Sequence, residues 1–152
     1  MRHRCAGKKL GRNASHRYSM ERNFVCSVIK HERVVTTLQK AKGLKRAVEK
    51  MITLGRKAAR QIETKDQDKA YLQTYRRAIS YLRDKAAAKK LVEELGKRYQ
   101  TRAGGYTRIL RLEGYRIGDG GSKAILELVD NQVLAKQLAK KAEAEAQPAQ
   151  AK

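Results

Sequence analysis

Excess positive charge constrains this chain more than any other feature of its sequence. Its 152 residues contain 36 Lys and Arg but 15 Asp and Glu, which gives a formal net charge of +21 and a pI near 10.3. Charges of one sign repel one another and oppose a compact state. A pI above about 9 is typical of domains that bind nucleic acids. We therefore expect the native state to be a complex with a polyanion.

The supply of apolar side chains is small for a chain of this length. Leu, Ile, Val and Phe make up about a fifth of the residues, a fraction near the border of intrinsic disorder when the net charge is high. The charge is also uneven, with 17 Lys and Arg against three acids in residues 1–60 and five of each in residues 119–152. We expect one domain, residues 15–130, between a basic arm (1–14) and a low-complexity tail (131–152).

Apolar residues at helical spacing predict four helices. Ser15 is a suitable N-cap for the first helix, and Gly96 is placed to end the last. The second helix carries a basic face opposite its apolar stripe, formed by Lys40, Lys42, Lys45, Arg46, Lys50 and Arg56. The four apolar stripes are Met20, Phe24, Val28 and His31; Leu38, Ala41, Leu44, Val48, Ile52, Ala59 and Ile62; Tyr71, Tyr75, Ala78 and Leu82; and Leu91, Val92 and Leu95.

Three β-rich segments predict strands. The first is the short β-branched run Val34–Thr37, and the others are Tyr106–Leu112 and Ala124–Val129. Four glycines lie between the second and third segments, so residues 113–122 should form a loop or hairpin turn.

The strongest chemical feature is the basic segment MRHRCAGKKLGRNASHR, which has no acidic residue in 17 positions. Gly7 and Gly11 make it flexible, and a flexible chain rich in donors can follow the phosphates of a nucleic acid. Because Leu10 is the one apolar anchor in residues 1–14, this arm should be mobile in the free protein and become ordered on RNA. The alternative is a charged terminus that faces only water. The expected RNA contacts are Arg2, His3, Arg4, Lys8, Lys9, Arg12, His16 and Arg17, with Arg22 just beyond the segment.

A second candidate is the segment RAGGYTRILRLEGYRIGDGG, residues 102–121. Arginine makes forked contacts to phosphate, and tyrosine can stack on bases or hydrogen-bond to ribose. Two adjacent glycines permit close backbone approach to an anion. The alternative is a glycine turn before an edge strand whose arginines face water and whose tyrosines belong to the core. The expected contacts are Arg102, Gly104, Gly105, Tyr106, Arg108, Arg111 and Arg116.

Other chemistries find little support in the sequence. His3, His16 and His31 lack a nearby pair of carboxylates that would complete a nuclease site, and Cys5 and Cys26 lack the spacing of a zinc site or a disulfide framework. The glycine runs match neither a P-loop nor a dinucleotide fingerprint. There is no run of about 18 apolar residues that would span a membrane, and no apolar secretory signal. We expect a cytoplasmic protein with no enzymatic activity, metal or cofactor.

Four separated segments resemble one known family, in the same order along the chain. They are the opening MRHR with LGRN and SHR, then VVTTL, then LVEELGKRYQTRAGGYTRIL, and finally the glycine loop followed by AILELVD. Together, over residues 1 to about 60 and about 86 to 130, they are similar to bacterial ribosomal protein L17. The segment RAGGYTRI is the most specific of the four.

The resemblance implies a fold and a partner. The expected fold is a small two-layer α+β domain with helices packed on one side of a short mixed sheet. The expected partner is large-subunit (23S) rRNA near the outer end of the exit tunnel, with neighbouring large-subunit ribosomal proteins beside it. Nine residues carry over by position as RNA-facing: Arg2, His3, Arg4, Arg12, His16, Arg17, Arg102, Tyr106 and Arg108.

The chain departs from the family's pattern in a few places. Residues 61–85 match poorly, and the tail after Asp130 is an extension without a family role. Cys5 stands where a basic residue is usual, and Gln39 stands where a proline is common, which leaves the start of the second helix less sharply defined. The alternative function is a free-standing basic protein that compacts or regulates DNA or RNA.

The composition of the tail generates a first prediction. Residues 139–152 contain no bulky apolar side chain and, with three Lys and two Glu, add one unit to the net positive charge. We expect deletion of these residues to leave folding and incorporation into ribosomes intact, as measured by thermal melting and by co-sedimentation with the large subunit. Loss of incorporation would show that the tail has a partner of its own.

Overall fold

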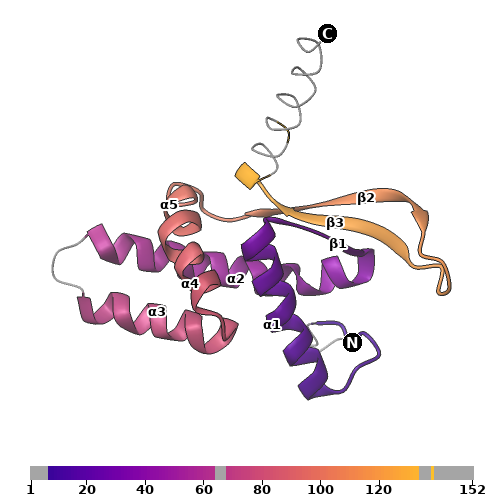
Figure 1. Cartoon of the computed structure of the whole chain (residues 1–152), viewed down its shortest axis with the longest axis horizontal. Helices are drawn as coiled ribbons and strands as arrows, with labels where there is room; N and C mark the ends of the chain where they lie inside the picture. Colours follow the sequence, from indigo (N-terminus) through magenta and orange to yellow (C-terminus); the bar gives the residue numbers. More distant parts are fainter. Residues whose placement is uncertain (1–6, 64–67, 134–137, 139–152) are drawn as a thin grey trace, which may run out of the picture.

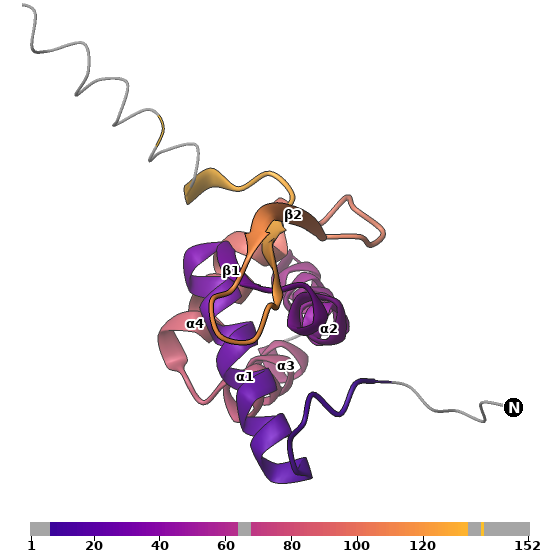
Figure 2. The same ribbon diagram turned by 90° about the vertical axis from the view of Figure 1, so that its right-hand side faces the viewer.

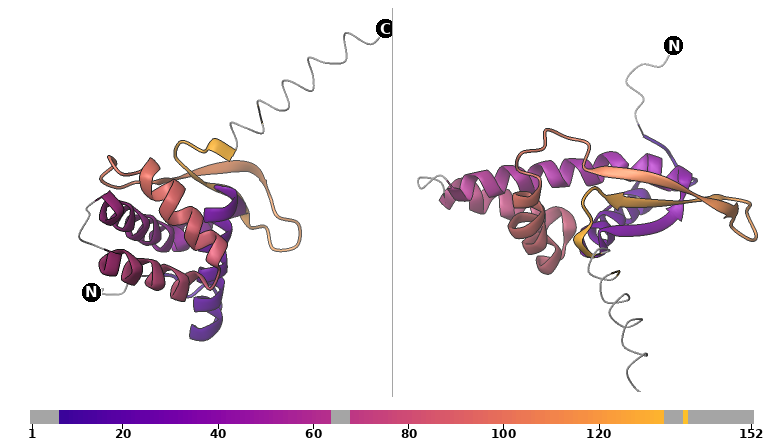
Figure 3. Two further views of the ribbon diagram at one scale, coloured as in Figure 1. Left: turned by 60° about the vertical axis from the view of Figure 1, so that its left-hand side comes forward. Right: turned by 90° about the horizontal axis from the view of Figure 1, so that it is seen from above.

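The computed structural model describes residues 7–63, 68–133 and 138, and it has two layers (Figure 1). A small sheet lies over a layer of helices, and Figures 2 and 3 show the helices on one side of it. This confirms the predicted α+β fold. The elements are α1 (Ala14–His31), β1 (Arg33–Thr37), α2 (Leu38–Glu63), α3 (Asp68–Leu82), α4 (Lys85–Lys90), the π-helical turn η1 (Leu91–Leu95), α5 (Gly96–Arg98), β2 (Thr107–Tyr115) and β3 (Ser122–Leu128).

The sheet is antiparallel throughout, so the expectation of a mixed sheet is wrong. Its strand order is β1-β3-β2, and both β1 and β2 pair with the central β3 in antiparallel register. The reason is local for β2 and β3, since the short glycine-rich turn between them returns the chain at once. The core-facing row of the sheet includes Val34, Ile109 and Leu126.

The N-cap of helix α1 lies two residues earlier than predicted. Asn13, not Ser15, is the N-cap, and its side-chain oxygen accepts a hydrogen bond from the His16 amide at 2.9 Å. The buried face of α1 is Val25, Val28 and Ile29, so it is rotated from the predicted stripe, and His31 is exposed.

Helix α2 is the central element, and its predicted stripe is confirmed. Ala41, Leu44, Val48, Ile52 and Ala59 are all buried, and the helix packs against α1, α3, η1, α5 and the sheet. Helix α3 runs beside α2 and contributes the buried residues Ala78 and Leu82 as predicted. The 26 residues of α2 therefore connect the two ends of the domain.

Gly96 does not end a helix as predicted. It has helical backbone angles, φ −59° and ψ −45°, and the helical path runs through it from α4 to α5. A Cβ at Gly96 would lie 2.6 Å from the Gly55 carbonyl oxygen, and a Cβ at Gly55 would lie 2.7 Å from the Leu91 carbonyl oxygen. The two backbones touch where α2 crosses this segment, and only glycine fits at either position.

The glycine crossing predicts a position-specific loss of stability. Gly55→Ala should lower the free energy of unfolding by about 1 to 3 kcal/mol, because the added methyl group meets backbone rather than a movable side chain. Gly43→Ala in the same helix is the matched control, since its nearest neighbour would be Lys8 Cβ at an ordinary 3.6 Å. The control should be neutral or more stable by up to about 1 kcal/mol, because alanine favours helix. Urea unfolding measures both variants, and equal stability of the two would contradict the crossing.

A buried carboxylate connects the end of α1 to the helix α5. Glu32 is 1% exposed and has a left-handed backbone, φ 59°. Arg98 donates to both of its carboxylate oxygens, at 2.8 and 3.2 Å, and the Lys90 ammonium lies 3.1 Å away. The backbone amide of Gln132 also donates to the Glu32 carboxylate at 3.1 Å. Burial by itself raises the pKa of Glu32, but the hydrogen bonds and positive charge of Arg98 and Lys90 outweigh burial and lower that pKa.

The lowered pKa of Glu32 predicts a pH-dependent stability. A carboxyl group whose pKa is lower in the folded state stabilises the fold above its unfolded pKa, near 4.3, and loses that contribution as the pH falls further. Glu32→Gln should therefore lower the free energy of unfolding by about 3 kcal/mol at neutral pH, with the gap from wild type narrowing below pH ~4. The exposed Glu94 gives the control, since Glu94→Gln should change stability by less than about 0.5 kcal/mol. A gap that stays constant from neutral to acid pH would show that charge at Glu32 is not responsible.

Candidate nucleic-acid interface

The described part of the basic arm lies against the first turns of α2. The Lys8 ammonium donates to the Gln39 side chain, and both Lys8 and Leu10 pack beside Gly43. Leu10 is half-buried and Gly11 follows it in a turn, both with positive φ. The prediction of an irregular arm is confirmed for residues 7–13. Leu10, the one apolar anchor expected of the arm, packs beside Gly43 together with Lys8. Arg2, His3 and Arg4 lie outside the described residues.

Three of the expected contacts gather where the arm enters α1. The Arg12 guanidinium donates to the Leu10 carbonyl oxygen at 2.9 Å and lies 3.3 Å from the His16 ring nitrogen. Arg17 donates to the Arg12 carbonyl oxygen at 3.4 Å. These bonds position the cations without involving a carboxylate, so their charge is available to a partner.

Arg22 lies one turn further along α1 in a different environment. Its guanidinium carbon is 4.0 Å from the centre of the Tyr18 ring, and one of its nitrogens donates to the Tyr18 hydroxyl at 2.8 Å. The side chain of Arg22 is half-buried in this contact. The Arg22 guanidinium carbon also lies 5.8 Å from the centre of the Tyr81 ring of α3. This position favours a role for Arg22 in packing α1 against α3.

The β2–β3 hairpin presents the second group of expected contacts. Residues 110–120 are exposed, including Arg111, and the hairpin extends past the helical layer (Figure 1). At its tip the Arg116 guanidinium forms two hydrogen bonds with the Asp119 carboxylate, one of them at 2.8 Å. The contact with Arg116 lowers the pKa of Asp119 well below its usual range. This pair fixes the tip, and Tyr115 beside it is exposed.

Arg108 is paired within the sheet. Its guanidinium donates to the Glu127 carboxylate at 2.5 Å, and Arg33 of β1 approaches the same carboxylate at 3.6 Å. Glu127 is 1% exposed. The three residues form one row across the strands, since Glu127 is the register partner of both arginines. Arg108 is thus partly neutralised, although its side chain stays more than half exposed.

The loop before β2, residues 102–105, contains the third group of expected RNA contacts. Gly104 and Gly105 are exposed, and a Cβ at either would meet nothing within 4 Å, so no packing reason explains these glycines. Gly105 has φ +68°, which favours glycine there. The Arg56 guanidinium of α2 donates to the Arg102 carbonyl oxygen, which brings a further cation to this loop. The sequence pointed to Arg56 only as part of a basic helix face.

Tyr106 lies in the core and not on the interface. It is 1% exposed, and its ring centre is 5.3 Å from that of Tyr99. A ring in this position cannot stack on a base, so the alternative of a core tyrosine applies here. Tyr115 is the tyrosine of this segment that the structure exposes.

The expected contacts therefore form two regions rather than one. The arm, the start of α1 and the start of α2 lie toward the end of the domain where the hairpin tip projects, whereas the 102–105 loop lies at the opposite end of the sheet (Figure 1). Strand β2 has nine residues, so it separates the two regions by about 30 Å.

Residues 7–63 and 68–133 contain no cluster of three or more His, Cys, Asp or Glu suited to a metal ion. Cys26 is a free thiol 3.6 Å from the Asp84 carboxylate, and burial raises its pKa. Among the helices described, none is long and apolar enough to cross a membrane.

Comparisons with known proteins identify the family. The family described as Ribosomal protein L17 matches residues 20–129. The large ribosomal subunit protein bL17 of Geotalea daltonii is 46% identical over 141 residues, covering 93% of this chain and 71% of the relative. The bL17 proteins of Trichlorobacter lovleyi and Geobacter metallireducens are 45% and 44% identical, covering 86% and 99% of this chain and 94% and 74% of the relatives. Since the match extends over most of both sequences, the chain belongs to the ribosomal protein L17 family.

Proposed function

We propose that this protein is a structural constituent of the large ribosomal subunit that binds and stabilises large-subunit rRNA. Membership of the L17 family supports the assignment, and the three relatives are named as proteins of that subunit. The family is structural rather than enzymatic. The proposal includes a cytoplasmic location within the ribosome, and neighbouring ribosomal proteins near the outer end of the exit tunnel, as the resemblance implies.

The placement of charge carries the proposal. The two fully buried carboxylates of the described chain, Glu32 and Glu127, each lie between two basic side chains. By contrast, no carboxylate of the described residues pairs with Arg12 or Arg17, whose hydrogen bonds go to backbone carbonyl oxygens and to the His16 ring. These two acids therefore neutralise basic residues near the core, while the arm and the start of α1 retain their charge for phosphates.

The mechanism is charge neutralisation combined with shape fit. Residues 15–130 act as one RNA-binding domain, and residues 1–14 act as an arm that extends its reach. The two basic regions, at the hairpin end and at the 102–105 loop, are too far apart to contact the same few phosphates. Each contacts a different RNA segment, so the rigid domain between them holds the two segments at a fixed distance.

The proposed electrostatic binding predicts a steep dependence on salt. If about eight phosphates are neutralised, the logarithm of the binding constant should fall with the logarithm of the salt concentration with a slope of about −6 to −7. Fluorescence anisotropy with large-subunit rRNA fragments at a series of KCl concentrations measures this slope. A nearly flat response would contradict the electrostatic mechanism.

The same assay separates the proposal from a free-standing DNA-compacting protein. A ribosomal protein should bind rRNA fragments more tightly than duplex DNA of equal length, and should stay with the large subunit through a high-salt wash. Tighter binding to duplex DNA, together with loss from washed subunits, would favour the alternative.

A further inference from the structure

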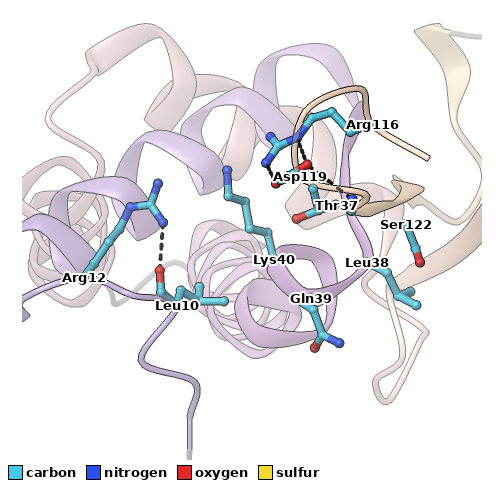
Figure 4. Close-up of a pocket in the computed structure, with 10 residues that line it drawn as sticks. Leu10, Arg12, Thr37, Leu38, Gln39, Lys40, Arg116, Asp119 and Ser122 are labelled. Carbon is cyan, nitrogen blue, oxygen red and sulfur yellow. Dashed lines mark hydrogen bonds and ion pairs between the residues drawn. The ribbon is translucent and has the colours of Figure 1, made fainter.

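A cavity of about 480 Å³ lies where three separated segments of the chain meet (Figure 4). The arm supplies Leu10 and Arg12, the start of α2 supplies Lys40, and the β2–β3 turn supplies Arg116 and Asp119. No aromatic residue is among those that line it, whereas hydroxyl groups are present. The lining therefore suits a small polar ligand better than a nucleobase.

Three cationic side chains converge on this cavity. Figure 4 shows Arg12 and Arg116 on either side of it, with Lys40 extending between them. Arg12 is held by the Leu10 carbonyl oxygen, and Arg116 is held by Asp119. Asp119 is the one acidic residue of the lining, so the cavity keeps an excess of positive charge.

Lys40, like Arg12, has no carboxylate partner among the described residues. Its side chain is half-buried. Three positive charges in one cavity repel one another, and an anion bound between them would attract all three and offset that repulsion. Lysine and arginine are the side chains that proteins use for phosphate, as a point charge and as a fork of donors respectively.

We propose that this cavity binds one backbone phosphate of an rRNA strand, with Arg12, Lys40 and Arg116 as its ligands. This inference rests on the proposed function and adds a defined subsite to it. The volume exceeds that of a bare phosphate and leaves room for the attached ribose, whose hydroxyl can meet the polar lining. Because the three ligands come from three segments, binding would fasten the arm and the hairpin tip to the start of α2.

The test compares two lysines of the same helix in the full chain. Lys40→Gln removes a cavity ligand, whereas Lys42→Gln removes an equal charge from an exposed position that does not line the cavity. Lys40→Gln should weaken binding to large-subunit rRNA and reduce the steepness of the salt dependence by about 0.7 to 0.9, the value for one phosphate. Lys42→Gln should have a clearly smaller effect on both. Circular dichroism melting checks that both variants fold.

A second measurement probes the cavity without rRNA. Inorganic phosphate and a short single-stranded RNA are titrated separately into isotope-labelled protein, and the amide signals of residues 37–40 and 116–122 are followed by NMR. Both ligands should shift these signals in the wild type and in Lys42→Gln, but not in Lys40→Gln, with saturation at a lower concentration for RNA. A site for free phosphate alone would respond to inorganic phosphate and not to RNA, which would overturn the assignment to RNA.

The outcomes separate the inference from the function on which it rests. Failure of the wild-type chain to bind rRNA would contradict the proposed function, and the phosphate titration would still decide whether the cavity holds an anion. Equal weakening by Lys40→Gln and Lys42→Gln, with wild-type binding intact, would overturn the cavity site alone.

Discussion

Repulsion among 21 uncompensated positive charges is the constraint on which the rest of this structure depends. The fold meets it by using its few acids selectively. Glu32 binds Arg98 and Lys90 beneath the end of α1, and Glu127 lies between Arg33 and Arg108 at the centre of the sheet. Basic residues that must lie near the core are thereby neutralised. Other cations lie on the arm, the helix starts and the hairpin, where a polyanion can reach them, although Arg116 at the hairpin tip is itself paired with Asp119.

Helix α2 turns this distribution of charge into a geometry. Its first turns support the arm through Gly43 and form a wall of the cavity through Lys40. Further along, Gly55 lets the 91–96 segment cross in backbone contact, and Arg56 reaches the loop before β2. One rigid element therefore sets the distance between both basic regions, and close packing at the glycine crossing keeps that distance fixed.

Regular elements with clear periodicity could be predicted from the sequence, because burial of one face leaves a direct record in residue spacing. The stripe of α2, strand β1 and the existence of a hairpin turn are examples. The predicted bounds of that turn, residues 113–122, were too wide, because β2 continues to Tyr115 and β3 begins at Ser122. Gly96 could not be assigned correctly, since a glycine that permits a helix crossing and one that ends a helix have the same local sequence. Tyr106 and Lys40 depend on long-range contacts: the core position of Tyr106 requires Tyr99 beside it, and the role proposed for Lys40 requires the arm and the hairpin tip to converge on it. The antiparallel pairing of β2 with β3 could have been predicted from the sequence, because the short turn between these strands allows no other pairing.

We propose that rRNA binds at the two basic regions and not at the neutralised surfaces between them. Protein–RNA crosslinking of intact large subunits, with the linked residues identified by mass spectrometry, tests this most directly. We expect crosslinks concentrated in residues 8–17, in the first turns of α2, at the hairpin tip and in the 102–105 loop. Crosslinks concentrated on α3, with those regions unmodified, would contradict it.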